Sequence, residues 1–262
     1  MKQNAGAGEN AMPDYRPTDD LPRYLDPSVK PAVEGIDLEQ PMNAILVCER
    51  TMPILYGPDF SPTSIRYLPG LRPVLEGIAG SLEGRSPRQR ADAAMGWIMR
   101  NVPHPYLVGD VAKDRAMTEE GLIASGIGWC NEQARVFIAL CEVMGIPGRM
   151  CFLTHQHGRC GHATSEVYLD GKWAWFDPTF GVRVPLPDGT LGTSAELSGP
   201  YRALAHKAYR PMLAECYPRF LPFVETESAW NSANRMPIDA GGDLLHTIGI
   251  CNYIIDGVVA GG

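Results

Sequence analysis

Apolar residues recur at helical spacing in two neighbouring segments, and the second segment begins with a clear capping signal. Ser86 is a favourable N-cap and Pro87 suits the first helical position, while two prolines after residue 102 end the pattern. The spacing predicts helices over 71–82 and 87–102. Their apolar faces consist of Leu71, Val74, Leu75, Ile78, Ala79 and Leu82 in the first, and of Ala91, Ala94, Met95, Ile98 and Val102 in the second.

Two further helices are expected downstream. The segment TEEGLIAS is predicted to be a short helix with Thr118 as its N-cap, ended by the glycines at 126 and 128. From 129 to 144 the run WCNEQARVFIALCEVM has an apolar stripe and ends before Gly145. Cys130 is therefore predicted to lie in the first turn of a core helix. The stripe consists of Val136, Phe137, Leu140, Val143 and Met144.

A strand and a hairpin are predicted after this helix. The apolar run RMCFLT at 149–154 is expected to be the strand, and the histidine-rich stretch HQHGRCGH at 155–162 is expected to be a loop. The segments HATSEVYL and KWAWFD then alternate on either side of Asp170-Gly171. An Asp-Gly pair between alternating runs is the strongest short-range signal for a hairpin.

The length of this turn sets the register of the hairpin. Two turn residues pair Leu169 with Lys172, which makes His162 and Asp177 diagonal neighbours on one face. Their backbones are then roughly 7–8 Å apart, a gap that an imidazole and a carboxylate can close. The rest of that face is predicted to line a site and the opposite face to be core, with Trp173 and Trp175 left as either packing or ligand-contacting residues. The first face carries Thr164, Glu166, Tyr168, Trp173 and Trp175, and the second carries Ala163, Ser165, Val167, Leu169, Ala174 and Phe176.

Outside this central region the pattern is weaker. Residues 1–40 are rich in Pro, Asp and Gly, and we expect them to form an extended arm before a single domain at 41–262. In the last part of the chain the pattern favours a helix near 201–214, a loop around 228–243 and a strand at 248–255.

Composition narrows the functional class. The chain of 262 residues has 30 acidic and 23 basic residues, a net charge of -7, and no basic cluster, so nucleic acid is not an expected partner. Neither an apolar leader nor a run of eighteen apolar residues is present, which predicts a cytoplasmic protein without a membrane partner. Seven cysteines without framework spacing favour reduced thiols.

Cys130 has suitable surroundings for a nucleophile. The glycines at 126 and 128 allow close approach of a substrate, and the first turn of a helix places unpaired N–H groups beside the sulfur. Both features favour a thiolate, and a paired imidazolium would strengthen that preference. The resulting hypothesis is a triad in which Cys130 attacks an acyl carbon, His162 moves the proton, and Asp177 fixes the imidazole tautomer. The Cys130 N–H would be one oxyanion donor.

Three ordered motifs strengthen this hypothesis. They are GWC at 128–130, MGIPGR at 144–149 and GHATSEVYLDGKWAWFDPT at 161–179. Together they resemble the transglutaminase-like superfamily of papain-type thiol enzymes, over about residues 85–182. The resemblance implies an α+β fold with a papain-like core, in which the nucleophile helix packs on an antiparallel sheet.

The same resemblance implies Cys130 as nucleophile, His162 as base and Asp177 as the orienting carboxylate, and it implies no cofactor. Thr164 departs from the family, which usually has an aromatic residue two positions after the histidine. Animal tissue transglutaminases use an upstream tryptophan as second oxyanion donor, but Trp97 could equally be a packing residue. The chain carries no calcium-loop motif, so calcium-dependent protein crosslinking is not implied.

Several alternatives remain open at this stage. His155, His157, Cys160 and His162 could form a zinc site, although all four lie in one short stretch; we expect no metal there. The favoured function is hydrolysis of a peptide-like amide through a Cys130 thioester, with a peptide or a small amide or acyl compound as substrate. Amide-forming transfer to an amine, as in a biosynthetic pathway, is the first alternative. A non-catalytic binding protein that retains the fold is the second.

Overall fold

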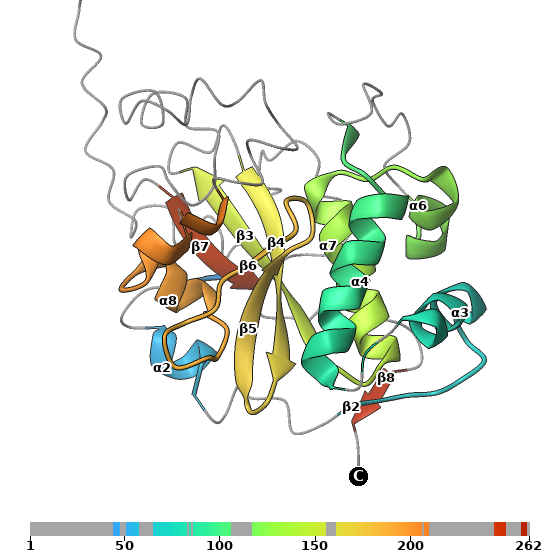
Figure 1. Ribbon diagram of the computed structural model, residues 1–262, viewed down its shortest axis with the longest axis horizontal. Coiled ribbons are helices and arrows are strands. Elements are labelled where there is room, and N and C mark those ends of the chain that lie inside the picture. The colour runs from blue at the N-terminus through green and yellow to red at the C-terminus, as the bar shows by residue number, and fades with distance from the viewer. Residues whose placement is uncertain are drawn as a thin grey trace, which may run out of the picture.

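The centre of the structure, a computed structural model, is an antiparallel sheet with helices on both of its faces (Figure 1). Within the described part of the chain the strand order is β1-β7-β3-β4-β5-β6, and a separate pair joins β2 to β8. The strands of the large sheet are β1 (Ala44–Leu46), β7 (Leu244–Gly249), β3 (Gly148–His155), β4 (Gly161–Leu169), β5 (Lys172–Asp177) and β6 (Val182–Arg183), and those of the pair are β2 (Ile65–Tyr67) and β8 (Val258–Ala260).

The structure describes only part of the sequence, and some predictions fall outside it. The predicted N-terminal arm at 1–40 and the loop at 228–243 lie outside the described residues. No helix among the described residues is long and apolar enough to cross a membrane. The described residues are 44–47, 51–57, 65–82, 84, 86–105, 117–155, 161–205, 207–209, 244–249 and 258–260.

The predicted helix starts are confirmed by their caps. Ser86 accepts a hydrogen bond from the Gln89 N–H at 3.2 Å, and Thr118 accepts one from the Gly121 N–H at 3.2 Å. The first helix is shorter than predicted, because Leu71 precedes it and is 56% exposed. The helices are α2 (Met52–Leu55), α3 (Pro73–Ser81), α4 (Pro87–Asn101), α6 (Glu119–Ser125), α7 (Cys130–Val143) and α8 (Ser194–Ser198).

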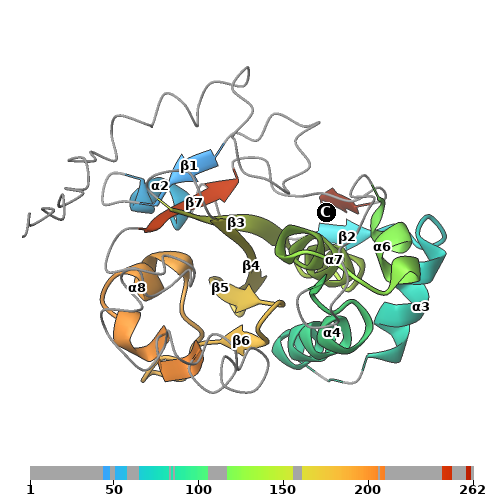
Figure 2. The ribbon, with the colours of Figure 1, turned by 90° about the horizontal axis from the view of Figure 1, so that it is seen from above.

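Helix α7 is buried around nearly its whole circumference, so the single apolar stripe predicted for it was too narrow. Helices α3, α4 and α6 contact it on one side and strands β3 and β4 on the other, as the view from above shows (Figure 2). Its polar first turn is enclosed as well, since Asn131, Glu132 and Gln133 are all buried. A helix in this position carries its first residue, Cys130, to the start of β4, where His162 and Ala163 lie.

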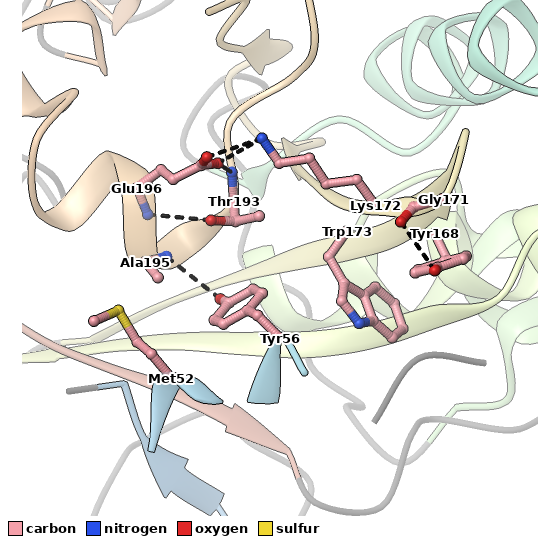
Figure 3. Close-up of a pocket in the computed structure, with 9 residues that line it drawn as sticks. All are labelled: Met52, Tyr56, Tyr168, Gly171, Lys172, Trp173, Thr193, Ala195 and Glu196. Carbon is pink, nitrogen blue, oxygen red and sulfur yellow. Dashed lines mark hydrogen bonds and ion pairs between the residues drawn. The ribbon is translucent and has the colours of Figure 1, made fainter. Parts of the chain in front are cut away.

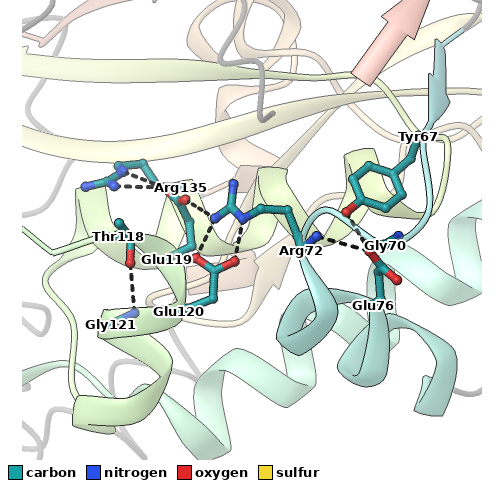
Figure 4. A network of polar contacts seen from close by, with 9 residues as sticks. All are labelled: Tyr67, Gly70, Arg72, Glu76, Thr118, Glu119, Glu120, Gly121 and Arg135. Atoms are coloured by element: carbon teal, nitrogen blue, oxygen red, sulfur yellow. Dashed lines mark hydrogen bonds and ion pairs between the residues drawn. The ribbon is translucent and has the colours of Figure 1, made fainter. Parts of the chain in front are cut away.

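An ion-pair network fastens α7 to its neighbours (Figure 4). Arg135 of α7 donates to Glu119 of α6 at 2.7 Å, and Arg72, just before α3, donates to the other Glu119 oxygen at 2.7 Å. Glu120 binds the same Arg72 guanidinium at 2.6 Å. The Glu119 carboxylate binds both arginines, so it links α6 to α7 and to the start of α3. Its side chain is only 5% exposed.

The hairpin of β4 and β5 has the predicted register. Leu169 pairs with Lys172, and each later pair along the ladder follows from that one. Asp170 and Gly171 form the turn with φ of 54° and 83°, as a type I′ turn requires. His162 and Asp177 therefore come to lie on one face, near the open end of the hairpin.

Predictions near the ends of the sheet were less accurate. Strand β3 extends to His155, which was expected to lie in a loop. Strand β7 begins four residues before the strand predicted at 248–255, of which only 248–249 lie among the described residues. The helix predicted at 201–214 is helical at 202–205 and 207–209, and residues 210–214 lie outside the described part.

Both faces of the hairpin are largely buried, so the middle of the face predicted to line a site is core instead. The Phe176 face packs on α7 in the larger core, as expected. On the opposite face, Glu166 is fully buried, and Trp173 and Trp175 are 2% and 1% exposed. A second core, formed with α2 and α8, covers Trp175 there. Sequence alternation could not reveal this, because polar residues on a strand usually face water.

The buried carboxylate of Glu166 binds three groups beneath this second layer. Its carboxylate forms an ion pair with Arg149 at 2.6 Å, both side chains being fully buried. It also accepts hydrogen bonds from the Tyr56 hydroxyl at 3.0 Å and the Ser194 N–H at 2.6 Å. One carboxylate thus joins two strands to the chain segments of α2 and α8.

Replacing Glu166 with Ala should destabilise the protein by about 3–5 kcal/mol, because the buried Arg149 charge would lose its partner. The measurement is urea unfolding followed by circular dichroism. Lys172→Met is the matched control: it breaks the Lys172–Glu196 ion pair, whose side chains are 32% and 30% exposed, and should cost about 0–1 kcal/mol. Equal losses in the two variants would contradict the role assigned to the buried pair.

Candidate active site

His162 and Asp177 meet as the hairpin register predicts. His162 Nε2 lies 2.7 Å from Asp177 Oδ2, and the Asp177 side chain is fully buried, while that of His162 is 9% exposed. Because Nε2 is bound to the carboxylate, the second ring nitrogen is left to face the Cys130 sulfur. The carboxylate therefore selects which nitrogen can exchange a proton with the thiol.

Asp177 is itself held by three donors. Its Oδ1 accepts hydrogen bonds from the backbone N–H groups of Thr179 at 2.9 Å and Phe180 at 3.2 Å, an Asx-type turn after the strand. The Tyr209 hydroxyl donates to Oδ2, and the Phe180 ring lies 5.3 Å from the His162 ring. Sequence reasoning missed Tyr209, since nothing in its local pattern links it to a residue 32 positions earlier.

Cys130 is the first residue of α7 and is partly exposed. Its sulfur accepts hydrogen bonds from the side chains of His162 and His104 and from the Ala163 backbone N–H. Burial raises the pKa of the Cys130 thiol, but these hydrogen bonds and the positive charge of His162 outweigh burial and lower it to about 5. The sulfur is therefore a thiolate at neutral pH.

The pKa of His162 moves the opposite way. Burial lowers it, but the charge and hydrogen bond of Asp177, together with Cys130, raise it to about 10. Between these two values the pair exists as thiolate and imidazolium. That state combines a ready nucleophile with a proton donor beside it.

The other two described cysteines, Cys141 and Cys151, have raised pKa values. Burial raises the pKa of Cys141 well above its usual range, and the Glu142 charge adds to the effect. Burial and the charge of Glu166 do the same for Cys151. Among the described free cysteines, therefore, Cys130 alone has a lowered pKa.

His104 is the contact that sequence reasoning missed entirely. It follows α4, is 6% exposed, and its ring meets the Trp129 ring edge to face, with centroids 5.1 Å apart. Trp97, considered from the sequence as an oxyanion donor, instead packs against the larger core. The sequence signal that could have pointed to His104 is VPHP at 102–105, in which prolines on both sides hold the histidine in an extended backbone.

Gln133 links the parts of the site to one another. From α7, its Nε2 donates to the Val102 carbonyl at 2.8 Å, and its Oε1 accepts from the Thr179 hydroxyl at 2.6 Å. The Thr179 N–H in turn donates to Asp177. The nucleophile helix, the segment before His104 and the turn after Asp177 are thus joined through one buried amide.

The zinc alternative concerns four residues of one short stretch, 155–162. His157 and Cys160 lie outside the described residues, and His155 is described only as the last residue of β3. Among the described residues no group of three or more His, Cys, Asp and Glu side chains could hold a metal ion. His162 is bound to Asp177.

A hollow of about 280 Å³ lies at the turn end of the hairpin, where Gly171 belongs to its wall (Figure 3). His162 and Asp177 lie toward the opposite end of the same strands, so this hollow is separate from the thiol site. Its lining residues are Met52, Tyr56, Tyr168, Gly171, Lys172, Trp173, Thr193, Ala195 and Glu196.

Comparison with known proteins agrees with this arrangement. Residues 76–178 match the model of the transglutaminase-like superfamily, the family that the motifs at 128–179 resemble. The helix-on-antiparallel-sheet architecture confirms the predicted α+β class. Members of that superfamily are generally cysteine-dependent enzymes.

Similar solved structures include a TGase, 16% identical over 40% of this chain and 30% of that chain, with a TM-score of 0.33. Another is a candidate cysteine protease from Cytophaga hutchinsonii, 27% identical over 55% of this chain and 45% of that chain, with a TM-score of 0.34. This chain therefore spans less than half the length of either. No curated protein matches the chain.

Alkylation of Cys130 by iodoacetamide should rise through about pH 5 and then stay on a plateau through neutral and alkaline pH, since the thiolate forms above the lowered pKa of the cysteine. In His162→Ala the thiol loses a hydrogen bond and a positive charge, so its pKa rises and labelling at neutral pH falls. Peptide mass spectrometry of the alkylated protein gives both profiles.

Cys141 and Cys151 are internal controls for this measurement, because both are fully buried and their pKa values are raised. Neither should react at neutral pH in the folded protein. Equal labelling of all three, or a Cys130 profile with its midpoint near that of an ordinary thiol, about 8.5, would contradict the thiolate assignment.

Proposed function

We propose that this protein is a thiol-dependent hydrolase of peptide-like amides that acts through a thioester at Cys130. The observation that supports the proposal best is the position of His162, hydrogen-bonded to the Cys130 sulfur on one side and 2.7 Å from the Asp177 carboxylate on the other. Cysteine, imidazole and carboxylate in this order are the parts of a nucleophilic triad.

In the acylation step the Cys130 thiolate attacks the carbonyl carbon of the amide. A sulfur–carbon bond forms, and the π electron pair of the carbonyl moves to its oxygen. When this pair returns, the carbon–nitrogen bond breaks, and the His162 imidazolium gives its proton to the departing nitrogen. The products are a thioester, a free amine and a neutral imidazole.

In the second step the neutral His162 takes a proton from water as the water oxygen attacks the thioester carbon. Collapse of the resulting oxyanion expels the Cys130 thiolate and releases a carboxylic acid. An amine in place of water would give amide transfer by the same proton movements. Hydrolysis is the simpler form, since water requires no second substrate-binding surface.

Intact-mass spectrometry should detect an acyl adduct on Cys130 after brief incubation with a panel of peptide amides and thioesters, quenched in acid. Cys130→Ala should carry no adduct, and His162→Ala should acylate more slowly by roughly 10²–10⁴-fold, the usual contribution of an acid–base residue. Absence of an adduct across the panel, or a similar adduct in Cys130→Ala, would favour the non-catalytic alternative.

The fate of the adduct separates hydrolysis from transfer. A trapped acyl-enzyme is mixed with buffer alone or with added glycinamide, and the mass of the released product is measured by mass spectrometry. We expect free acid in both mixtures. An amide product that dominates at low glycinamide concentration would show the transferase reaction instead.

A further inference from the structure

The backbone on the N-terminal side of His104 is fixed to the segments that carry the nucleophile. The Gly128 N–H donates to the Pro103 carbonyl at 3.2 Å, and the Gln133 amide donates to the Val102 carbonyl at 2.8 Å. These two bonds pin the backbone just before His104 to the loop and helix that carry the nucleophile.

Gly128 permits this close approach. A Cβ atom at this position would lie 2.9 Å from Val102 Cγ1, closer than carbon atoms tolerate. Prolines on both sides of His104 also limit its backbone freedom. With its ring edge to face with that of Trp129, the imidazole has little freedom to turn away from the sulfur.

We propose that His104 is a catalytic residue, whose imidazole N–H donates a hydrogen bond to the oxyanion that forms when Cys130 attacks an acyl carbonyl. This inference rests on the proposed function and adds to it a side-chain donor that the triad does not supply. The Cys130 backbone N–H, in the first turn of α7, would be the other donor.

The geometry supports this role because the ring contact with Trp129 places His104 beside the first residue of α7, and both His104 and His162 lower the pKa of the Cys130 thiol through hydrogen bonds. In the tetrahedral intermediate the oxygen is bonded to the carbon that the sulfur has just attacked. An N–H that reached the sulfur can therefore shift to that oxygen with a small movement. His162 is committed to Asp177 and to the leaving group, which leaves His104 to serve the oxyanion without exchanging a proton itself.

Two probes separate this role from its alternatives. Acylation by p-nitrophenyl acetate passes through a tetrahedral oxyanion, and its good leaving group needs no proton from His162. Alkylation by iodoacetamide displaces iodide at a saturated carbon and forms no oxyanion. Both reactions need the Cys130 thiolate, so their ratio isolates the oxyanion step.

The variants are His104→Phe, which keeps an aromatic ring against Trp129 but has no donor, and His104→Gln, which restores an N–H. At the alkaline plateau of each variant, His104→Phe should acylate roughly 10²–10³-fold more slowly than wild type, the usual cost of one oxyanion donor. Its iodoacetamide rate should be essentially unchanged. His104→Gln should recover part of the acylation rate.

Other outcomes overturn the inference in identifiable ways. Equal losses in the two reactions would show that His104 only supports the thiolate, and no loss in either would show that it only packs. A loss in Trp97→Phe without one in His104→Phe would move the donor to Trp97. If wild-type Cys130 is alkylated but never acylated, the proposed function itself fails, whatever the variants do. Circular dichroism melting curves confirm that each variant is folded.

Discussion

The two-residue turn at Asp170 and Gly171 is the constraint on which the candidate site depends. Strand residues alternate between faces, so one additional turn residue would shift the register and place His162 and Asp177 on opposite faces of the hairpin. The positive φ values of both turn residues fix this length. Packing of the hairpin's Phe176 face on α7 then holds the hairpin against the helix that begins with Cys130.

A closed chain of polar contacts surrounds the thiol. It runs from the Val102 carbonyl through Gln133 to Thr179, from there to Asp177 and His162, and through the Cys130 sulfur to His104. Every link is a hydrogen bond between segments distant in sequence, apart from the short turn at Asp177. Such a chain restrains each side chain from two sides, as preorganised electrostatic stabilisation requires.

The features that sequence predicted well are local ones. Helix caps at Ser86 and Thr118 and the Asp-Gly turn depend on neighbours within a few residues, and the register follows from counting. His104 and Tyr209 were missed because their partners are 26 and 32 positions away along the chain, and no period connects them. The buried face around Glu166 was misjudged for a related reason: alternation reports polarity, whereas here a second layer of structure covers the polar side chains.

The second layer also helps to hold the carboxylate of the candidate site. Tyr209, which donates to Asp177, belongs to the core that Glu166 helps to fasten to the sheet through α2 and α8. A nascent chain that has formed α7 and the hairpin but not this layer lacks one donor to the carboxylate and the cover over its far face. The position of the Asp177 carboxylate is therefore fully fixed only when this layer has packed on the sheet.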